Sequence, residues 1–247
     1  MFGQLPSGAS LIQFEKLDST SFEARRRAEA GARGALWIVA VEQTGGYGRR
    51  GAPWEQAAGD IAASLLFDPR AGKETLGQLS FVAALAAADA IRRFAPHLPL
   101  ALKWPNDILA GGGKIAGLLL ELIETPRGPL IALGVGVNIV SKPEIADYPA
   151  ARLIDWLDGA PAPGPQDFVR VLDEAFDAWR NRWRKEGFSP IRAAWLEAAA
   201  QKGEKIRVRL PHETIEGVFA DLDSTGALVL DCDGARRLVA AGTIIRT

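Results

Sequence analysis

Positions 103–107 read Lys-Trp-Pro-Asn-Asp, so that a lysine, an amide and a carboxylate share one turn. Such a cluster can hold a nucleotide phosphate and a metal ion together, because the cation binds the phosphate and the carboxylate binds the metal. An ordinary Pro-Asn turn would explain Pro105 and Asn106 but neither Lys103 nor Asp107. The turn is therefore a candidate site for phosphate chemistry.

Residues 43–51 form a glycine-rich segment between two apolar runs. Its four glycines let backbone amides approach phosphate oxygens, and Arg49 and Arg50 add forked donors that suit phosphate or carboxylate. A flexible surface hairpin with solvated arginines is the alternative, since glycine-rich loops are common. The segment is not a Walker loop, because no Lys-Ser or Lys-Thr follows the glycines.

Two more glycine-rich segments follow the turn at 103–107. Residues 111–117 place Lys114 between glycines, where its ammonium can reach an anion beside a sheet. Residues 134–138 end in Asn138, and their small side chains leave room for a flat ligand. A surface lysine beside a turn and a tightly packed sheet are the alternatives, so neither segment is specific by itself.

The elements that would carry these segments follow from the spacing of apolar residues. Thr20, with Glu23 three residues later, has capping-box spacing, which predicts a helix that Gly31 can end. After Gly203 the apolar period changes to two, and five short strands separated by turns predict a small barrel. Apolar runs predict further strands at 11–17, 35–42, 61–67, 100–103, 114–124 and 129–139, and helices at 75–94, 168–185 and 189–200.

Composition excludes several classes of protein. The 247 residues hold 29 Lys+Arg and 30 Asp+Glu, so the chain is not a general polyanion binder. Cys232 is the single cysteine, and His97 and His212 stand far apart, which excludes an internal disulfide and gives no zinc-ligand spacing. The chain has no apolar stretch of membrane-spanning length, and its start lacks a signal-peptide pattern. We therefore expect a cytoplasmic protein with no membrane partner.

Taken in order, the segments resemble the catalytic domain of biotin–protein ligases, and the resemblance covers nearly the whole chain. Ser19-Thr20 and the helix after it are similar to the family's Ser-Thr-Asn biotin segment. Residues 46–51, Gly-Tyr-Gly-Arg-Arg-Gly, followed by Trp54, resemble its Gly-Arg-Gly-Arg-Arg-Gly loop and tryptophan. The Lys-Trp-Pro-Asn-Asp turn is the most specific match, and residues 216–244 are similar to the family's C-terminal SH3-like barrel.

The resemblance implies an α/β (α+β) fold with two parts. Residues 1–200 would form a mixed sheet with flanking helices, like class II aminoacyl-tRNA synthetases and biotin synthetases, and residues 201–247 a small SH3-like β-barrel. The implied activity is ATP-dependent: biotin and ATP give biotinoyl-5′-AMP, and biotin then passes to a lysine of a biotin carboxyl carrier domain. A lipoate or octanoate ligase of the same fold is the alternative, although neither the Lys-Trp-Pro-Asn-Asp turn nor this tail is expected there.

The resemblance also implies roles for single residues. The implied biotin contacts are Ser19, Thr20, Gln43, Gly46, Arg49, Lys114 and Gly117. The implied nucleotide contacts are Arg49, Trp54, Asn106 and Asn138. Lys114, Arg49, Lys103 and Asp107 are the implied catalytic residues, with Lys114 between the biotin carboxylate and the α-phosphate. Asp107 would act through Mg²⁺ that accompanies ATP or on the incoming lysine, and no haem or zinc is implied.

Three positions depart from the family pattern. Ser21 stands where Asn is usual, Tyr47 where Arg is usual, and Ala52 where a basic residue is common. Because Tyr47 removes one guanidinium from the loop over the ligand, we expect weaker retention of the adenylate rather than a different reaction.

A nucleic-acid-binding protein is the non-enzymatic alternative. Residues 201–247 hold seven Lys+Arg and seven Asp+Glu, so the predicted barrel lacks the basic balance that a phosphate backbone requires. Repressing members of the family carry a winged helix-turn-helix before the ligase domain, whereas about ten residues precede the first expected strand here. We expect a ligase that does not bind DNA, and both a monomer and a homodimer fit the sequence.

Overall fold

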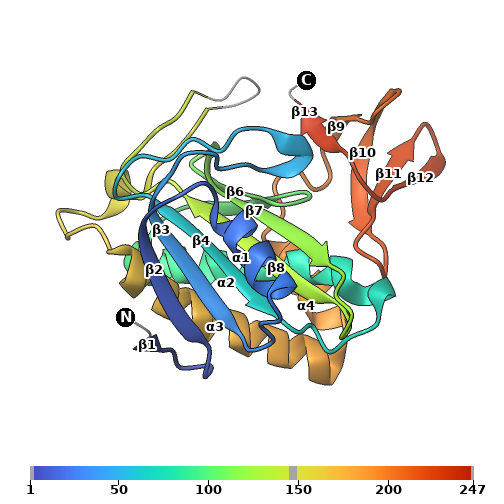
Figure 1. Ribbon diagram of the computed structural model, residues 1–247. Coiled ribbons are helices and arrows are strands. Elements are labelled where there is room, and N and C mark those ends of the chain that lie inside the picture. The colour runs from blue at the N-terminus through green and yellow to red at the C-terminus, as the bar shows by residue number, and fades with distance from the viewer. Residues whose placement is uncertain (1–2, 145–148, 246–247) are drawn as a thin grey trace.

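The computed structural model describes residues 3–144 and 149–245, and its central feature is an eight-stranded mixed sheet (Figure 1). The strands lie in the order β1-β2-β3-β4-β8-β7-β6-β5. β2 and β3 pair in parallel across a helical connection, and the other neighbours pair antiparallel. The strands are β1 Gly3–Gln4, β2 Ser10–Leu17, β3 Leu36–Gln43, β4 Ile61–Phe67, β5 Leu100–Lys103, β6 Asp107–Ala110, β7 Gly113–Ile123 and β8 Leu130–Val137.

Helices cover both faces of this sheet. α1 (Thr20–Glu29) lies on one face, and α2 (Leu79–Phe94) and α3 (Pro165–Glu186) pack together on the other, followed by α4 (Ser189–Glu197) (Figure 1). Side chains alternate along β3, so Leu36 and Ile38 join the core under α1, while Trp37 joins the core on the other face. Within the described ranges, every helix is too short or too polar to cross a membrane.

Two predicted helix starts need correction. The N-cap of α1 is Ser19, not Thr20: the Ser19 hydroxyl accepts from the backbone N–H of Ser21, and Glu23 binds Arg26 and Arg27 instead of closing a capping box. The helix expected from residue 75 begins at Leu79, because residues 73–78 form a 3₁₀ segment. The first correction matters for the site. Because Ser19 provides the cap, the Thr20 side chain is left to hydrogen-bond with Gln43 of β3 and Ser64 of β4.

A second, five-stranded antiparallel sheet forms the C-terminal part, in the order β12-β11-β10-β9-β13. The turn before β11 docks on the first part: Gly226 O accepts from Trp104 Nε1 (3.2 Å), and Ser224 O accepts from Gln78 Nε2 (3.0 Å). The predicted fold class is confirmed in both parts. The strands are β9 Lys205–Arg209, β10 Thr214–Leu222, β11 Leu228–Cys232, β12 Ala235–Val239 and β13 Thr243–Ile245.

Candidate active site

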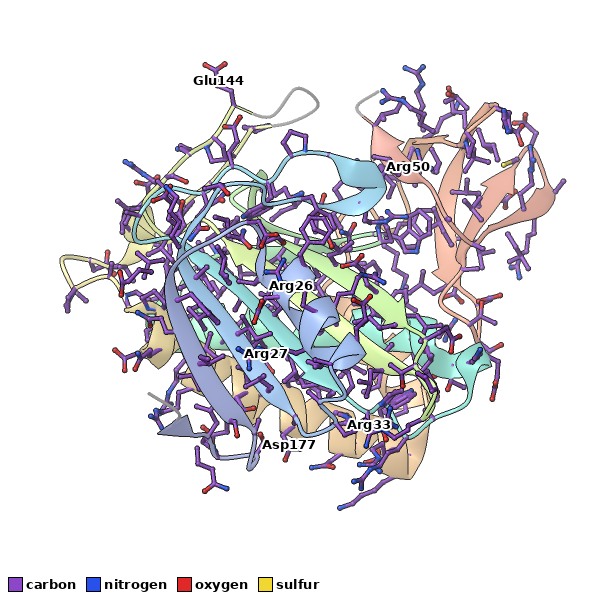
Figure 2. All side chains as sticks on the ribbon, viewed as in Figure 1. Arg26, Arg27, Arg33, Arg50, Glu144 and Asp177 are labelled. Atoms are coloured by element: carbon purple, nitrogen blue, oxygen red, sulfur yellow. The ribbon has the colours of Figure 1, made fainter. Side chains whose placement is uncertain are left out.

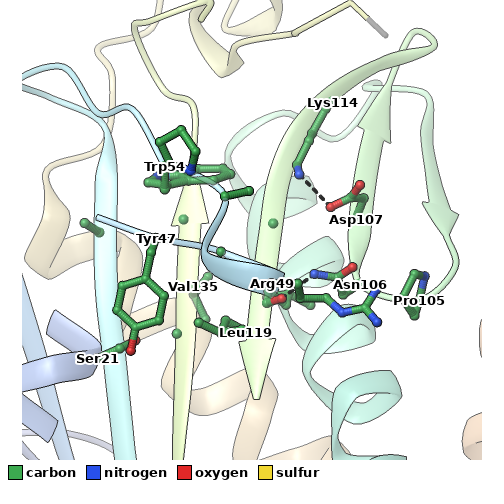
Figure 3. A pocket seen from close by; sticks show the side chains of 18 of the residues that line it. Ser21, Tyr47, Arg49, Trp54, Pro105, Asn106, Asp107, Lys114, Leu119 and Val135 are labelled. Carbon is green, nitrogen blue, oxygen red and sulfur yellow. Dashed lines mark hydrogen bonds and ion pairs between the residues drawn. The ribbon is translucent and has the colours of Figure 1, made fainter. Parts of the chain in front are cut away.

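The residues singled out by sequence meet at one pocket of about 210 Å³, which lies on the sheet under the loop that joins β3 to β4 (Figure 3). Thr243 and Ile244 of the C-terminal sheet line its side. Gly46 and Asn138 lie outside the lining. Ten of the twelve predicted site residues line the pocket: Ser19, Thr20, Gln43, Arg49, Trp54, Lys103, Asn106, Asp107, Lys114 and Gly117.

One end of the pocket, which we call the head end, is a chain of hydrogen-bonded hydroxyls and one amide: Thr20, Ser21, Gln43 and Ser64. The N–H and the hydroxyl of Thr20 both donate to Gln43 Oε1, at 2.8 and 3.1 Å. Ser64 Oγ donates to Thr20 Oγ1 (2.8 Å), so Ser21, 3.1 Å from Ser64 Oγ, must donate to Ser64. Gln43 therefore keeps its Nε2 donors for a ligand.

The start of α1 holds the head end in place. Ser19 N donates to Asp18 Oδ1 at 2.7 Å, and both terminal nitrogens of Arg26 donate to the same carboxylate. The hydrogen bond from Arg26 lowers the pKa of Asp18 to about 2. The first turn of α1 is thereby tied to its own N-terminus, which fixes Thr20 against β4.

The opposite end, which we call the charged end, consists of Lys103, Asp107, Lys114 and Arg49. Lys114 Nζ lies 2.7 Å from Asp107 Oδ1, and their side chains are only 16% and 13% exposed. Lys103 and Asp107 stand opposite each other in the β5–β6 register. Cationic groups of this density, partly removed from water, suit a ligand that carries phosphate.

The indole of Trp54 lies between the two ends, flat on the backbone of two paired strands. Gly117 and Gly136 are register partners in β7 and β8. A Cβ added at Gly136 would stand 2.3 Å from the indole, and one at Gly117 would stand 2.9 Å from it. Lys114 Nζ lies 5.5 Å from the ring centroid. Small residues in these strands do receive a flat group, and that group is the side chain of Trp54.

Arg49 connects the loop to the C-terminal sheet. Its Nη1 donates to Gly242 O at 3.1 Å, and burial, aided by the neighbouring charge of Arg50, lowers the pKa of its guanidinium. Arg50 has a positive φ of 57° and lies where the loop approaches the C-terminal sheet (Figure 2). A desolvated guanidinium that is held by one carbonyl keeps donors for an anion.

Tyr47, one of the departures from the family pattern, anchors the loop on the other side. Its hydroxyl donates to Glu121 Oε2 at 2.8 Å, and its ring packs against Phe22 with centroids 4.6 Å apart. Burial, followed by the hydrogen bond to Glu121, raises the pKa of Tyr47 well above its ordinary value. The side chain thus fastens the loop to β7 as a neutral group.

The two predicted residues outside the lining support those inside it. Asn138 is 1% exposed, and its Nδ2 donates to Lys114 O (3.2 Å) and Ala151 O (3.1 Å). Its Oδ1 meets no donor within residues 3–144 and 149–245. A Cβ at Gly46 would stand 2.8 Å from both Gln43 Nε2 and Trp54 O, so only glycine fits there.

Sequence reasoning missed Ser64 and the role of Gly134. Ser64 is fully buried in β4, and a Cβ at Gly134 would stand 2.9 Å from Ser21 Oγ. A single hydroxyl inside an apolar strand was the available signal, because a buried hydroxyl needs a partner. The glycine alternation at 134 and 136 was another, because it puts both residues on one face of β8.

Comparisons with known proteins agree with this architecture. The profile of the biotin/lipoate A/B protein ligase family matches residues 12–138, and the chain belongs to that family. The profile of the biotin protein ligase C-terminal domain matches residues 203–246. The resemblance expected from the sequence is thereby confirmed over both parts of the chain.

Individual relatives extend over almost the same length. The biotin–[acetyl-CoA-carboxylase] ligase of Paracoccus denitrificans is 40% identical over 236 residues, covering 93% of this chain and 97% of that protein. The ligase of the same name from Mycobacterium tuberculosis is 32% identical, covering 92% and 85%. The biotin protein ligase from Aquifex aeolicus in complex with biotin and ATP shares the fold, with a TM-score of 0.82 at 23% identity, covering 96% of this chain and 99% of that one.

Proposed function

We propose that the chain is an ATP-dependent biotin–protein ligase. It joins biotin to ATP as biotinoyl-5′-AMP and then transfers biotin to a lysine of a biotin carboxyl carrier domain. The observation that carries the proposal is the division of one pocket into a neutral, hydrogen-bonding head end and a charged end on either side of Trp54. Biotin has the same division, with a ureido ring at one end and a carboxylate at the other.

The head end favours biotin over the alternative acids. A ureido ring offers two N–H donors and one carbonyl acceptor, which complement the remaining lone pairs of Ser19 and Thr20 and the Nε2 donors of Gln43. The dithiolane of lipoate and the chain of octanoate have none of these groups. Either acid would leave buried polar groups without partners, and such a site discriminates strongly against them.

The charged end suits the first chemical step. The carboxylate oxygen of biotin attacks the α-phosphorus of ATP, and pyrophosphate leaves. Lys114 between the two anions offsets their repulsion and stabilises the charge that develops on the phosphate oxygens. We assign Arg49 and Lys103 to the same phosphate and carboxylate charges, because both side chains line the pocket beside Lys114 and are largely removed from water.

Two groups with unused hydrogen-bonding capacity support the nucleotide assignment. Within the described residues, buried Trp54 Nε1 has no acceptor and buried Asn138 Oδ1 has no donor. An adenine ring presents both an amino donor and ring-nitrogen acceptors, which are the two kinds of partner that these atoms lack. We therefore keep Trp54, Asn106 and Asn138 on the nucleotide side, and Gly46 and Gly117 on the biotin side.

Asp107 would serve the second step, in which the lysine amine of the carrier attacks the acyl carbon and AMP leaves. An ammonium must lose a proton before it attacks, and a carboxylate at this end can accept that proton. Among the described lining residues Asp107 is the one carboxylate, and it would be the protein group that holds Mg²⁺ brought by ATP. When bound, Mg²⁺ neutralises phosphate charge.

The remaining assignments follow from the activity. The protein partner is the carrier domain of a carboxylase, and the reaction belongs in the cytoplasm. The balanced charge of residues 201–247 argues against DNA as a partner.

We place the boundary between the two parts at residues 200 and 201. Ala198 and Ala200 still hydrogen-bond to Leu102 of β5, whereas Gly203 N donates to Phe219 O of the second sheet. A monomer and a homodimer are both compatible with this account.

Pyrophosphate–ATP exchange by the purified protein tests the proposal, with biotin, lipoate or octanoate supplied separately. Exchange with biotin alone is the expected result, followed by transfer of biotin to an isolated carrier domain. Exchange with lipoate or octanoate in place of biotin would refute the assignment of the head end. Absence of exchange with all three acids would refute the adenylation reaction itself.

A further inference from the structure

A buried carboxylate outside the pocket, Asp60, holds two functional segments together. Asp60 lies directly before β4 and is 2% exposed. Its Oδ1 accepts from three consecutive backbone N–H groups, those of Ile139 (2.8 Å), Val140 (2.8 Å) and Ser141 (3.1 Å). These residues directly follow Asn138.

The other oxygen of Asp60 faces its own loop. Oδ2 accepts from Ala57 N at 3.0 Å and from the Ser141 hydroxyl. Gln56 in the same loop donates to the carbonyl oxygens of Ala40 and Val41, which ties the loop to β3. This loop directly follows Trp54, so a single carboxylate couples the segment after Trp54 to the segment after Asn138.

We propose that Asp60 is a positioning residue for nucleotide binding, an inference that rests on the proposed assignment of Trp54 and Asn138 to the nucleotide. A carboxylate that accepts five hydrogen bonds fixes the backbone from which it receives them. Asn138 Oδ1 is aimed by that backbone, together with the bonds from its Nδ2 to Lys114 O and Ala151 O. Without Asp60, three neighbouring N–H groups lose their acceptor and the segment after β8 must rearrange.

The head end has no comparable dependence on Asp60. Thr20, Gln43 and Ser64 are connected through side chains on α1, β3 and the middle of β4, not through residues 139–141. A change at Asp60 should therefore act on ATP and leave biotin almost unaffected. An effect on ATP without an effect on biotin distinguishes a positioning role from a general loss of stability, because a partly unfolded protein would bind both substrates less well.

The test uses Asp60→Ala and Asp60→Asn in the full chain, with Asp173→Ala as the matched control. Asp173 is also 2% exposed and accepts three hydrogen bonds, from Ser7 N, Ser7 Oγ and Trp37 Nε1, away from the pocket. KM for ATP and KM for biotin are measured by exchange, the dissociation constants by calorimetry, and Tm by thermal unfolding. The comparison variant for the nucleotide side is Asn138→Ala.

The expected result is a rise of about tenfold in KM for ATP in Asp60→Ala, with KM for biotin within about twofold of wild type. The KM for ATP of Asp60→Asn should lie between the values for wild type and Asp60→Ala. The Oδ1 of the asparagine can still accept the three N–H groups, whereas its Nδ2 opposes the N–H of Ala57. Asp173→Ala should lower Tm without raising KM for ATP relative to KM for biotin. If Asp60→Ala does not fold, Asp60→Asn gives the same test.

Equal changes in both KM values, or a lower Tm with neither KM changed, would overturn the role of Asp60 while leaving the ligase activity intact. Failure of the proposed function itself would be recognised differently, in the wild-type protein, as missing exchange with biotin. An unchanged KM for ATP in Asn138→Ala would overturn the action of Asp60 through Asn138.

Discussion

The two ends of the pocket are built on opposite principles. At the head end, the hydroxyl hydrogens of Thr20, Ser21 and Ser64 are used within the protein, and the proposed biotin contacts are the lone pairs of Ser19 and Thr20 and the Nε2 donors of Gln43. At the charged end, Lys114 is already paired with Asp107 at 2.7 Å. A ligand adds hydrogen bonds at the first end but must exchange partners at the second.

This difference separates recognition from chemistry. A head end whose donors and acceptors are fixed in advance binds a neutral ring with little reorganisation. At the charged end, Lys114 is paired with Asp107, and the proposed mechanism requires phosphate to compete with Asp107 for this lysine. In the proposed mechanism, the head end selects the acid through hydrogen-bonding groups that are already in place, and the charged end activates it through ion pairs that must rearrange.

The largest expected effect is at the charged end. Lys114→Ala should reduce biotin-dependent exchange by a factor of about 10² to 10³ or more, because the charge between the two anions is lost. Near wild-type turnover would contradict the role of Lys114. Lys73→Ala is the control, since Lys73 pairs with Glu124 on the surface (64% exposed) and should leave the rate unchanged. Circular dichroism should show the same fold in both variants.

Substitutions of two glycines in β8 distinguish the two ends of the pocket most clearly. Gly136→Ala would place its Cβ against Trp54, and Gly134→Ala would place its Cβ against Ser21 Oγ. Overpacking of this kind costs about 1–3 kcal/mol, so each variant should lose roughly tenfold or more in affinity at its own end. We expect Gly134→Ala to raise KM mainly for biotin and Gly136→Ala to raise KM mainly for ATP. Identical effects of the two substitutions on both substrates would remove the distinction.

A smaller effect is expected from Ser64→Ala. The substitution deletes the hydroxyl that donates to Thr20, which costs about 1 kcal/mol, or about fivefold in KM for biotin. Selectivity for biotin over lipoate should narrow, because Thr20 is no longer oriented. Initial rates at varied biotin and varied ATP measure the effect, and a rise confined to KM for ATP would contradict it.

The smallest effect concerns the start of α1. Because Arg26 lowers the folded-state pKa of Asp18 from 3.8 to about 2, the ionised carboxylate stabilises the fold above pH 3.8, and this stabilisation is lost as the pH falls through 2. Asp18 is 47% exposed, so Asp18→Asn should cost only about 0.5 kcal/mol or less at neutral pH. Urea unfolding of both proteins measures the difference in their free energies of unfolding, which should vanish in acid. A difference that grows as the pH falls would contradict the stabilising role of the ionised Asp18.

The sequence predicted β2, β3, β4, β5, β7 and β8 of the first sheet from their apolar runs, but not the short strands β1 and β6. It predicted most of the site because Lys103, Asp107 and Lys114 lie on or next to three strands that pair in succession, β5, β6 and β7. Spacing and resemblance were sufficient for those residues, since neighbouring strands with short turns must bring them together.

The remaining features depend on contacts between segments far apart in the chain. Nothing near Ser64 indicates that its partner is Thr20, 44 residues earlier, and nothing near Asp60 indicates that it accepts from residues 139–141. Asn138 was expected to line the pocket, but it lies outside the lining, where its Nδ2 donates to Lys114 O. Local patterns do not contain the tertiary hydrogen bonds that decide these roles.

Calorimetric titration of the wild-type protein with biotin alone and ATP alone, at about 0.05 M and about 0.5 M salt, tests the central difference most directly. The account predicts that the dissociation constant of biotin rises less than about threefold, because biotin brings a single carboxylate to the charged end while its ureido ring meets neutral groups. ATP should bind at least about tenfold more weakly at the higher salt, because its several phosphate charges would meet Arg49, Lys103 and Lys114 at the charged end. Equal salt dependence for the two ligands would contradict the division of the pocket into a neutral and a charged end.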